Sequence, residues 1–229
     1  MEDYLKAIYC IQTQSGPPVS TSAIAEAVDK TPASVTSMLG TLEDRGLVTH
    51  RKYKGVELTA EGETVALEVL RHHRLIEAYL AEHLDYARSE VHDEADALEH
   101  HISEAFEERV AAALGDPAVD PHGDPIPSAD LSPLTDDDTT PLSAHEAGDR
   151  VEVARVSDRN REDLEYIEAA GITPGTALDI VGVAPFGMVT VAVDGDAEQS
   201  LPEPIAESIR VRATTDASAP AGRGEVTDA

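Results

Sequence analysis

Apolar residues recur at helical spacing in three short blocks near the start of the chain, and turn-forming residues separate these blocks. The first block, residues 1–14, carries one apolar stripe and ends at Gly16, which two prolines follow. A second helix is predicted at 22–28 and a third at 32–45, where Pro32 suits a first helical turn because it lacks an N–H. Two short helices joined by a tight turn predict a helix-turn-helix.

The third helix leaves small polar side chains exposed near its N-terminus, and a hairpin with a basic tip follows it. In a helix-turn-helix the second helix of the motif enters the major groove of DNA, and a basic hairpin suits phosphate contacts as a wing. The alternative is a helical domain whose hairpin only supports other elements. The residues that we expect to face DNA are Thr31, Ala33, Ser34, Thr36 and Ser37 on the helix and Arg51, Lys52 and Lys54 on the hairpin.

Further helices are predicted at 60–84, 89–98 and 102–114, and the first two carry histidines and carboxylates at helical spacing. His73 and Glu77 stand four residues apart, so a helix places both on one face. A solvated surface pair is the simpler interpretation of these two alone, but a second helix of the same kind favours a divalent cation site. Imidazole and carboxylate ligands without thiolate suit manganese or iron. The candidates on the second helix are His92, Asp96, Glu99 and His100.

The last third of the chain alternates apolar and polar residues in short stretches that Gly and Pro separate, which is typical of strands. The predicted strands are 150–156, 177–183, 188–193 and 208–211, with a helix at 161–170 between the first two. A stretch rich in Pro and Asp predicts a linker at 131–143. Residues 214–229 are expected to form a disordered tail.

The chain is acidic, but its charge is unevenly distributed. Its 229 residues include 45 Asp or Glu and 17 Lys or Arg, which gives a formal net charge of −28. Residues 1–80 carry 11 acidic and 8 basic side chains, a net of −3, and the remaining residues carry a net of −25. The predicted DNA-reading module is therefore comparatively basic. Abundant acid, few lysines and no Trp resemble the proteins of halophilic organisms, whose cytoplasm is very salty.

The sequence carries few signals that indicate the cellular compartment of the protein. The single cysteine, Cys10, excludes an internal disulfide and fits a reducing compartment. No apolar run approaches the roughly 20 residues that a membrane-spanning helix needs. We therefore expect a cytoplasmic protein with no membrane partner.

The order of helix-turn-helix, wing, RHHRLIEAYL, VHDEADALEHHISEAFEERV and GDPAVDPHGDPIP resembles the DtxR family, the diphtheria-toxin-repressor type of metal-dependent transcriptional regulators. The string PHGDPIP is typical of the end of the family's dimerisation domain, and in that segment we interpret His122 as a turn residue. The GITPG turn resembles the Src-homology-3-like domain of longer members, which is related to FeoA. The resemblance implies a homodimer that binds double-stranded operator DNA, with Mn(II) or Fe(II) as cofactor.

The resemblance also implies two metal sites. Asp3 and Asp96 occupy positions at which iron-responsive members offer sulfur from Met and Cys. Carboxylates at these positions resemble the manganese-responsive branch. That branch has a further acidic ligand where this chain has Lys6, which leaves a pairing of Lys6 with Asp3 open as an alternative. The implied ligands are His73, Glu77 and His92 for the first site, Asp3, Asp96, Glu99 and His100 for the second, and Glu162 or Asp163 from the C-terminal domain as a contribution to the first.

We therefore expect a mainly α fold with a small β domain. The predicted order is a winged helix-turn-helix at 1–69, a helical metal-binding and dimerisation domain at 70–130, the acidic linker at 131–143, an SH3-like domain at 144–213 and the tail. The expected function is a metal-dependent repressor that senses Mn(II) or Fe(II) and controls metal-uptake genes, with no enzymatic activity. The alternatives are a metalloenzyme with a histidine and carboxylate centre and a metal-binding or storage protein without DNA-binding activity.

Overall fold

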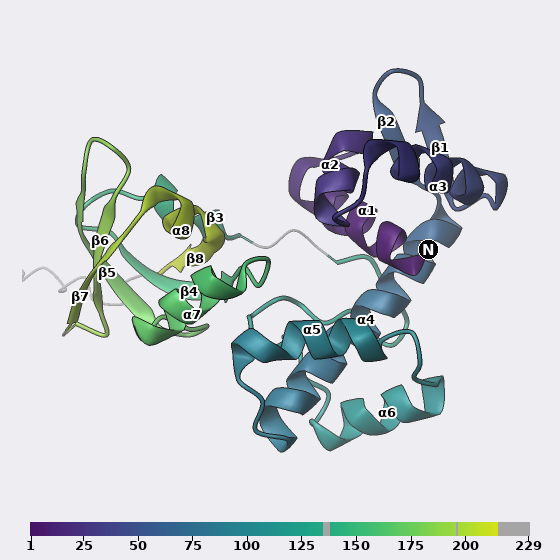
Figure 1. Ribbon diagram of the computed structural model, residues 1–229. Helices are drawn as coiled ribbons and strands as arrows, with labels where there is room; N and C mark the ends of the chain where they lie inside the picture. Colours follow the sequence, from purple (N-terminus) through teal and green to yellow (C-terminus); the bar gives the residue numbers. More distant parts are fainter. Residues whose placement is uncertain (135–137, 196, 215–229) are drawn as a thin grey trace, which may run out of the picture. The chain divides into compact units, whose positions relative to one another are not determined.

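The computed structural model describes residues 1–134, 138–195 and 197–214 (Figure 1). The chain forms two compact units, residues 1–138 with 158–165, and residues 139–157 with those from 166 onward. The tail predicted at 214–229 lies outside the described residues, apart from Thr214. None of the helices within these ranges combines the length and the apolar character needed to cross a bilayer.

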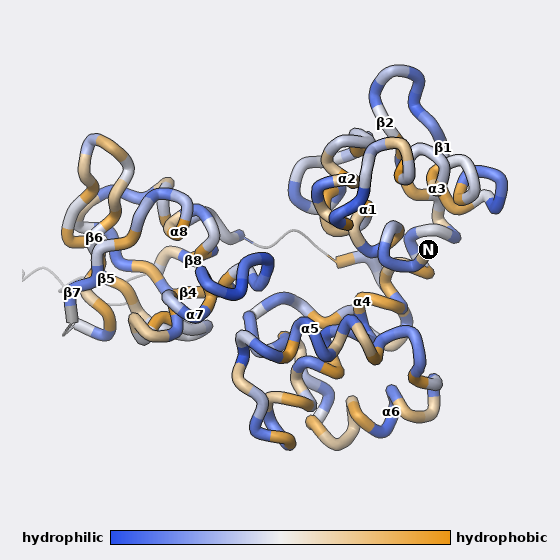
Figure 2. The backbone as a smooth tube through the Cα atoms, in the orientation of Figure 1, coloured by the Kyte–Doolittle hydropathy of each residue, from blue (hydrophilic) through white to orange (hydrophobic). Residues whose placement is uncertain are grey.

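The first unit begins with the predicted helix-turn-helix and wing. Ser20 and Thr31 accept hydrogen bonds on their hydroxyl oxygens from backbone N–H groups, so each caps the helix that follows it. The wing tip is hydrophilic (Figure 2). The elements are α1 (Glu2–Ser15), α2 (Thr21–Ala27), α3 (Pro32–Asp44) and the antiparallel strands β1 (Val48–Arg51) and β2 (Gly55–Leu58). Their core includes Leu5, Ile8, Ile24, Leu39 and Leu42, all fully buried.

Helix α4 (Ala60–His83) follows directly after the wing and extends to the other helices of the same unit. Its first half closes the core of the DNA-reading module through Ala66, Leu67 and Leu70. Its second half packs against α5 (Arg88–Leu98) and α6 (Glu104–Ala113) in two smaller apolar clusters. One uninterrupted helix therefore connects the wing with the residues predicted to bind metal.

A buried polar network fixes α6 and the end of α5 on α4. Arg71 and His72 both contact the carboxylate of Glu107, and Arg71 also donates to the carbonyl oxygen of Pro127. Nδ1 of His72 lies 3.2 Å from the carbonyl oxygen of Glu99 and donates to it, because a carbonyl only accepts. The backbone of Glu99 is therefore held by His72 on α4, and His72 is held in turn by Glu107 on α6.

Residues at both ends of the predicted linker contact neighbouring elements. Leu131 and Leu134 pack against the core of the DNA-reading module, and the backbone N–H of Leu134 donates to the Tyr9 hydroxyl at 2.9 Å. Thr140 and Pro141 pair with a strand of the second unit. The Pro and Asp content indicated a linker but did not reveal these two leucines as anchors. Residues 135–137 lie outside the described part.

The second unit is a six-stranded antiparallel sheet with the order β3-β8-β4-β5-β6-β7. It contains the four predicted strands, together with the short edge strand β3, strand β7 and helix α8, which were not predicted. The predicted helix at 161–170 is α7 (Arg161–Ala169), whose first turn belongs to the first unit. The bounds are β3 (Thr140–Pro141), β4 (Arg150–Val156), β5 (Ala177–Val183), β6 (Val189–Val193), β7 (Ala197–Leu201), α8 (Glu203–Ser208) and β8 (Ile209–Ala213).

Candidate metal centre and DNA-reading surface

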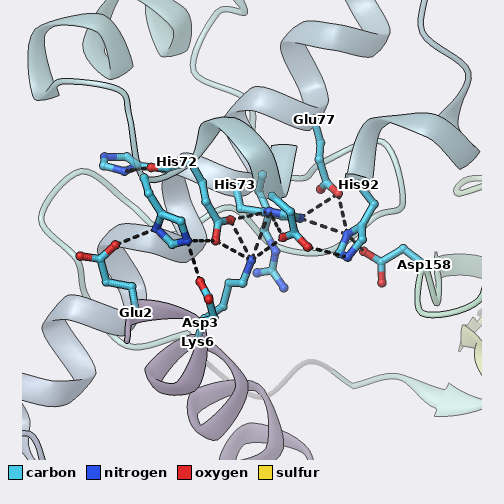
Figure 3. Close-up of polar contacts among 12 residues, drawn as sticks. Glu2, Asp3, Lys6, His72, His73, Glu77, His92 and Asp158 are labelled. Atoms are coloured by element: carbon cyan, nitrogen blue, oxygen red, sulfur yellow. Dashed lines mark hydrogen bonds and ion pairs between the residues drawn. The ribbon is translucent and has the colours of Figure 1, made fainter. Parts of the chain in front are cut away.

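The first cluster joins helices α4 and α5 to the segment 158–165 of the same unit (Figure 3). Nε2 of His73 lies 3.0 Å from Oε1 of Glu77, and Nδ1 of His92 lies 3.3 Å from the same oxygen. Nδ1 of His92 is also 3.0 Å from Oδ2 of Asp158. Each of these four residues offers a ligand atom, and the four atoms all lie within 4.8 Å of one another.

The charges of the first cluster are strongly coupled. Burial opposes the imidazolium form of His73, but the charge of Glu77 and hydrogen bonds to Glu77 and Glu99 outweigh it and raise the His73 pKa to about 9. Burial also opposes the charge on His92, yet Asp158 and Glu77 raise its pKa to about 11. The pKa of Asp158 is lowered despite burial, chiefly by His92. The carboxylates of the first cluster therefore favour the protonated form of each histidine, although Nε2 of His73 and Nδ1 of His92 lie only 3.2 Å apart.

A third group of potential ligands adjoins Glu77 on its inner side. Nε2 of His122 lies 3.0 Å from the carbonyl oxygen of Arg88 and donates to it, so in the neutral imidazole Nδ1 carries the lone pair. That Nδ1 atom and Oε2 of Glu77 are buried, have no hydrogen-bond partner and lie 4.0 Å apart. A lone pair and a carboxylate oxygen left unpaired in the interior fit a cation. His122 is therefore placed as a candidate ligand, and its interpretation as a turn residue alone is incomplete.

Asp120 completes this third group. Its carboxylate accepts the backbone N–H groups of His122 and Asp124 and lies beside the Arg74 guanidinium. Burial and the neighbouring charges of Glu77 and Asp124 raise the pKa of Asp120 well above its ordinary value. The excess of buried carboxylate at this point is a second indication that a cation belongs here.

The second cluster lies between α1 and the end of α5. Nε2 of His100 is 2.6 Å from Oδ1 of Asp3 and 3.3 Å from Oε1 of Glu99, and its Nδ1 is 2.7 Å from a carboxylate oxygen of Glu2. The carboxylate of Glu99 also lies 2.6 Å from Nδ1 of His73. Glu99 thus orients the ring of His73, as carboxylates beside metal-binding histidines do.

Lys6 occupies the middle of the polar cluster (Figure 3). Its Nζ donates to Asp96 at 2.9 Å and to Glu99 at 2.7 Å. Burial opposes the ammonium form, but Glu99 and Asp96 outweigh it and raise the Lys6 pKa. The alternative pairing of Lys6 with Asp3 is not what the structure shows, because Asp3 contacts His100 instead.

Glu162 and Asp163 were the candidates from the C-terminal domain, and the structure leaves Glu162 exposed and Asp163 half-buried. Their backbone N–H groups are capped by Asn160, and neither residue belongs to a ligand group among the described residues. The side chain that reaches the first cluster is Asp158, four and five residues earlier in the chain. Its acidic residue type was the only available signal, and that signal is weak in so acidic a chain.

The predicted DNA-facing residues are all exposed. Thr31, Ala33, Ser34, Thr36 and Ser37 line the free N-terminal half of α3. On the wing, Arg51 is bound by Glu57 through Nε at 2.7 Å and Nη2 at 2.5 Å, so its charge is partly neutralised. Lys52 and Lys54 are exposed, and Lys52 lies 5.1 Å from the ring centre of Tyr53, a side chain that is 94% exposed.

These features are typical of a winged-helix DNA-binding protein, and they include a candidate metal centre of histidines and carboxylates. Three family models match the chain in the same order. The N-terminal DNA-binding domain of iron dependent repressors matches residues 1–56, their metal binding and dimerisation domain matches 59–128, and the FeoA domain matches 140–213.

Solved structures and sequence relatives agree with these matches. A manganese-dependent transcriptional repressor in complex with manganese is 38% identical, with a TM-score of 0.87, and the match covers 93% of this chain and 99% of that one. The manganese regulator SloR is 33% identical, with a TM-score of 0.78 over 93% of this chain and 98% of that one. The HTH-type transcriptional regulator MntR of Oceanobacillus iheyensis is 35% identical over 101 residues, which are 44% of this chain and 67% of that protein.

The chain belongs to the DtxR/MntR family of metal-dependent transcriptional repressors and carries a C-terminal FeoA domain. It is a metal-sensing, DNA-binding repressor. The expected fold class and family are confirmed. Its family consists of repressors, which agrees with the prediction that the chain is not an enzyme.

Proposed function

We propose that this protein is a cytoplasmic, homodimeric repressor of metal-uptake genes that responds to Mn(II), with Fe(II) as the second candidate. The observation that carries the proposal is the first cluster, in which His73, Glu77, His92 and Asp158 offer only nitrogen and oxygen. This ligand set favours a hard or borderline cation over a soft one. The similar solved structure that contains manganese supports the same choice.

Two clusters of potential ligands follow from the sequence candidates as the structure arranges them, and the first of these is proposed as the site that senses metal. The first comprises His73, Glu77, His92 and Asp158, with Asp120 and His122 on the inner side of Glu77. The second comprises Asp3, Glu99 and His100, with Asp96 turned toward Lys6. A divalent cation at the first site would neutralise carboxylates that protonated histidines otherwise balance. Glu162 and Asp163 are not proposed as ligands.

The link to DNA binding follows from the connections of the elements. Helix α4 runs from the wing to His73 and Glu77, and α1 brings Glu2, Asp3 and Lys6 against the end of α5. Residues that hold α1 and α5 together also restrict the orientation of α3 and the wing. We propose that metal binding shifts the population toward the orientation that matches the operator. The metal would link the helices that carry its ligands, and these helices would pass the change in orientation to α3 and the wing.

We propose that the dimer interface lies on helices α5 and α6. Leu98 and Phe106, on α5 and α6, are large apolar side chains that are 37% and 47% exposed. The matched family domain is described as a metal binding and dimerisation domain. A helix-turn-helix dimer reads two half-sites about one helical turn apart. Exposed apolar groups on these helices suit contact with a second copy.

The high net charge bears on how this repressor reads DNA. The affinity that phosphate contacts supply falls with salt, with a slope of about −0.9 per neutralised phosphate in a double-logarithmic plot. With a net charge of −28 and a composition that suits a salty cytoplasm, little of that affinity remains at multimolar salt. We propose that base contacts by α3 and readout of DNA shape contribute more than phosphate contacts do.

Paired variants separate metal sensing from DNA contact. Glu77→Gln should abolish manganese-dependent operator binding through loss of metal affinity, whereas Glu82→Gln, on the exposed face of the same helix, should change neither. Replacing Arg51, Lys52 and Lys54 together with Gln should weaken operator binding, most strongly at low salt, and leave manganese affinity nearly unchanged. Unchanged operator binding by the wing variant would refute the proposed interface, and substrate turnover by the metal-loaded protein would favour the enzyme alternative.

A further inference from the structure

The ammonium group of Lys6 has the surroundings of a bound cation. Its Nζ lies 2.9 Å from Oδ1 of Asp96, 2.9 Å and 2.7 Å from the two oxygens of Glu99, and 3.3 Å from Nδ1 of His73 at the edge of the first cluster. These are three carboxylate oxygens for the three N–H donors of one ammonium group. The side chain of Lys6 is only 16% exposed and that of Glu99 only 1%. The charge is therefore held inside the cluster.

Lys6 shares both carboxylate oxygens of Glu99 with a neighbouring histidine. Oε1 of Glu99, to which Lys6 donates, is also the oxygen that lies 3.3 Å from His100 in the group formed by Asp3, Glu99 and His100. Oε2 of Glu99 accepts from both Lys6 and His73. A divalent ion bound to Glu99 here would lie a few ångströms from a full positive charge. Repulsion between these charges would weaken such binding at least about tenfold, even with the screening found near a protein surface.

We propose that Lys6 is the resident cation of the second cluster, where its ammonium group binds Asp96 and Glu99 in place of a second metal ion. The chain then binds one divalent ion tightly, at the first cluster, and the second cluster joins α1 to α5 in the absence of metal. The inference rests on the proposed metal-sensing function, because it assigns the tight site to the first cluster.

Two kinds of contact follow from this role of Lys6: contacts that are present with and without metal, and contacts that change when metal binds. The contacts from Lys6 on α1 to Asp96 and Glu99 on the α5 side persist in chelator. The contacts among His73, Glu77, His92 and Asp158 change when an ion enters. A sensor of this kind responds to one ion per subunit and has no cooperativity between two ions in the same subunit.

Counting bound manganese tests the proposal directly. Equilibrium dialysis followed by elemental analysis should find one tightly bound ion per wild-type chain. Lys6→Met should tighten a second binding step at least about tenfold, because the carboxylates lose their resident cation. Lys6→Arg should retain a single ion, and Lys30→Met, which makes the same charge change on an exposed turn, should behave as the wild type. The manganese-induced rise in Tm should be larger for Lys6→Met than for either control.

A second measurement on the wild-type protein does not depend on how the variants fold. Acetic anhydride labelling followed by mass spectrometry should find Lys6 protected relative to Lys30, both in chelator and at saturating manganese. Two tight ions per wild-type chain, no tightening in a folded Lys6→Met protein, or a Lys6 that becomes as reactive as Lys30 with manganese would each overturn the proposal. Absence of any tight ion in the wild type would instead overturn the proposed function.

Discussion

Metal affinity should depend steeply on pH, because the first cluster holds protons where a cation belongs. The carboxylates around His73 and His92 raise their pKa values to about 9 and about 11, so both rings are protonated at pH 7. A ring nitrogen that binds a cation must first lose its proton. Binding of one manganese ion through both histidines should therefore release about two protons between pH 6 and 8.

The size of the effect follows from that proton count. The logarithm of the apparent association constant should rise by about two for each pH unit, or about four orders of magnitude from pH 6 to pH 8. Histidines with an ordinary pKa of about 6.5 would give little further increase above pH 7. The surrounding carboxylates thus move the pH dependence into the range where it is readily measured.

Competition against a chelating indicator of known affinity measures the slope, with ionic strength held constant. Titration calorimetry in two buffers of different ionisation enthalpy counts the released protons independently. His92→Gln should lower the slope by about one, because one of the two protonated ligands is gone. A wild-type slope below one between pH 7 and pH 8 would refute the reasoning.

The metal-free protein should show the opposite pH dependence in its stability. The folded pKa of His73 is raised, so its ion pairs stabilise the fold fully below the unfolded value of about 6.5. That contribution is lost as the pH rises through about 9. The Tm in chelator should therefore fall across this window. With saturating manganese the protons are already displaced, and the same fall should be absent.

Three further predictions concern the wing, the fold and the dimer. Glu57→Gln releases Arg51 from its ion pair and should tighten operator binding a few-fold at low salt, as anisotropy titrations would show, with less effect at high salt; weaker binding would contradict the wing assignment. Gly55→Ala places a Cβ 1.9 Å from the Val19 carbonyl oxygen at a φ of +126°, so it should lower the free energy of unfolding, measured with denaturant, by about 3 kcal/mol. As a control, Gly40→Ala meets no atom within 4 Å and should raise that free energy by about 1 kcal/mol. Phe106→Glu should produce monomers in sedimentation velocity at concentrations where the wild type is dimeric, and dimers that persist would exclude Phe106 from the interface.

The elements of the DNA-reading module were predictable because local signals specify them. Pro32 and the capping hydroxyls of Ser20 and Thr31 mark where α2 and α3 begin. The basic run in the wing is conspicuous in an acidic chain. The ion pair between Arg51 and Glu57 was less apparent, because strand register decides which carboxylate lies beside the arginine. Exposure of the α3 residues followed directly from helical periodicity.

The metal centre was predictable only where one helix supplies neighbouring ligands. His73 and Glu77 are adjacent because a helix repeats every 3.6 residues. Asp158 reaches His92 through tertiary structure across 66 positions of the chain, and no periodicity predicts such a contact. His122 and Asp120 belong to a segment whose prolines and glycine indicated only turns. Their burial against Glu77 shows that the same turn presents polar atoms to the cluster.

Operator binding measured against metal tests the central claim most directly. Fluorescence anisotropy of the chain with its own upstream DNA, at high potassium chloride, would be recorded in chelator and then with manganese, ferrous iron and zinc in turn. The account predicts weak binding in chelator and tight binding with manganese or iron, and this gain should be lost in Glu77→Gln. Equal binding in chelator and with metal would contradict it, because the metal would then not control DNA binding.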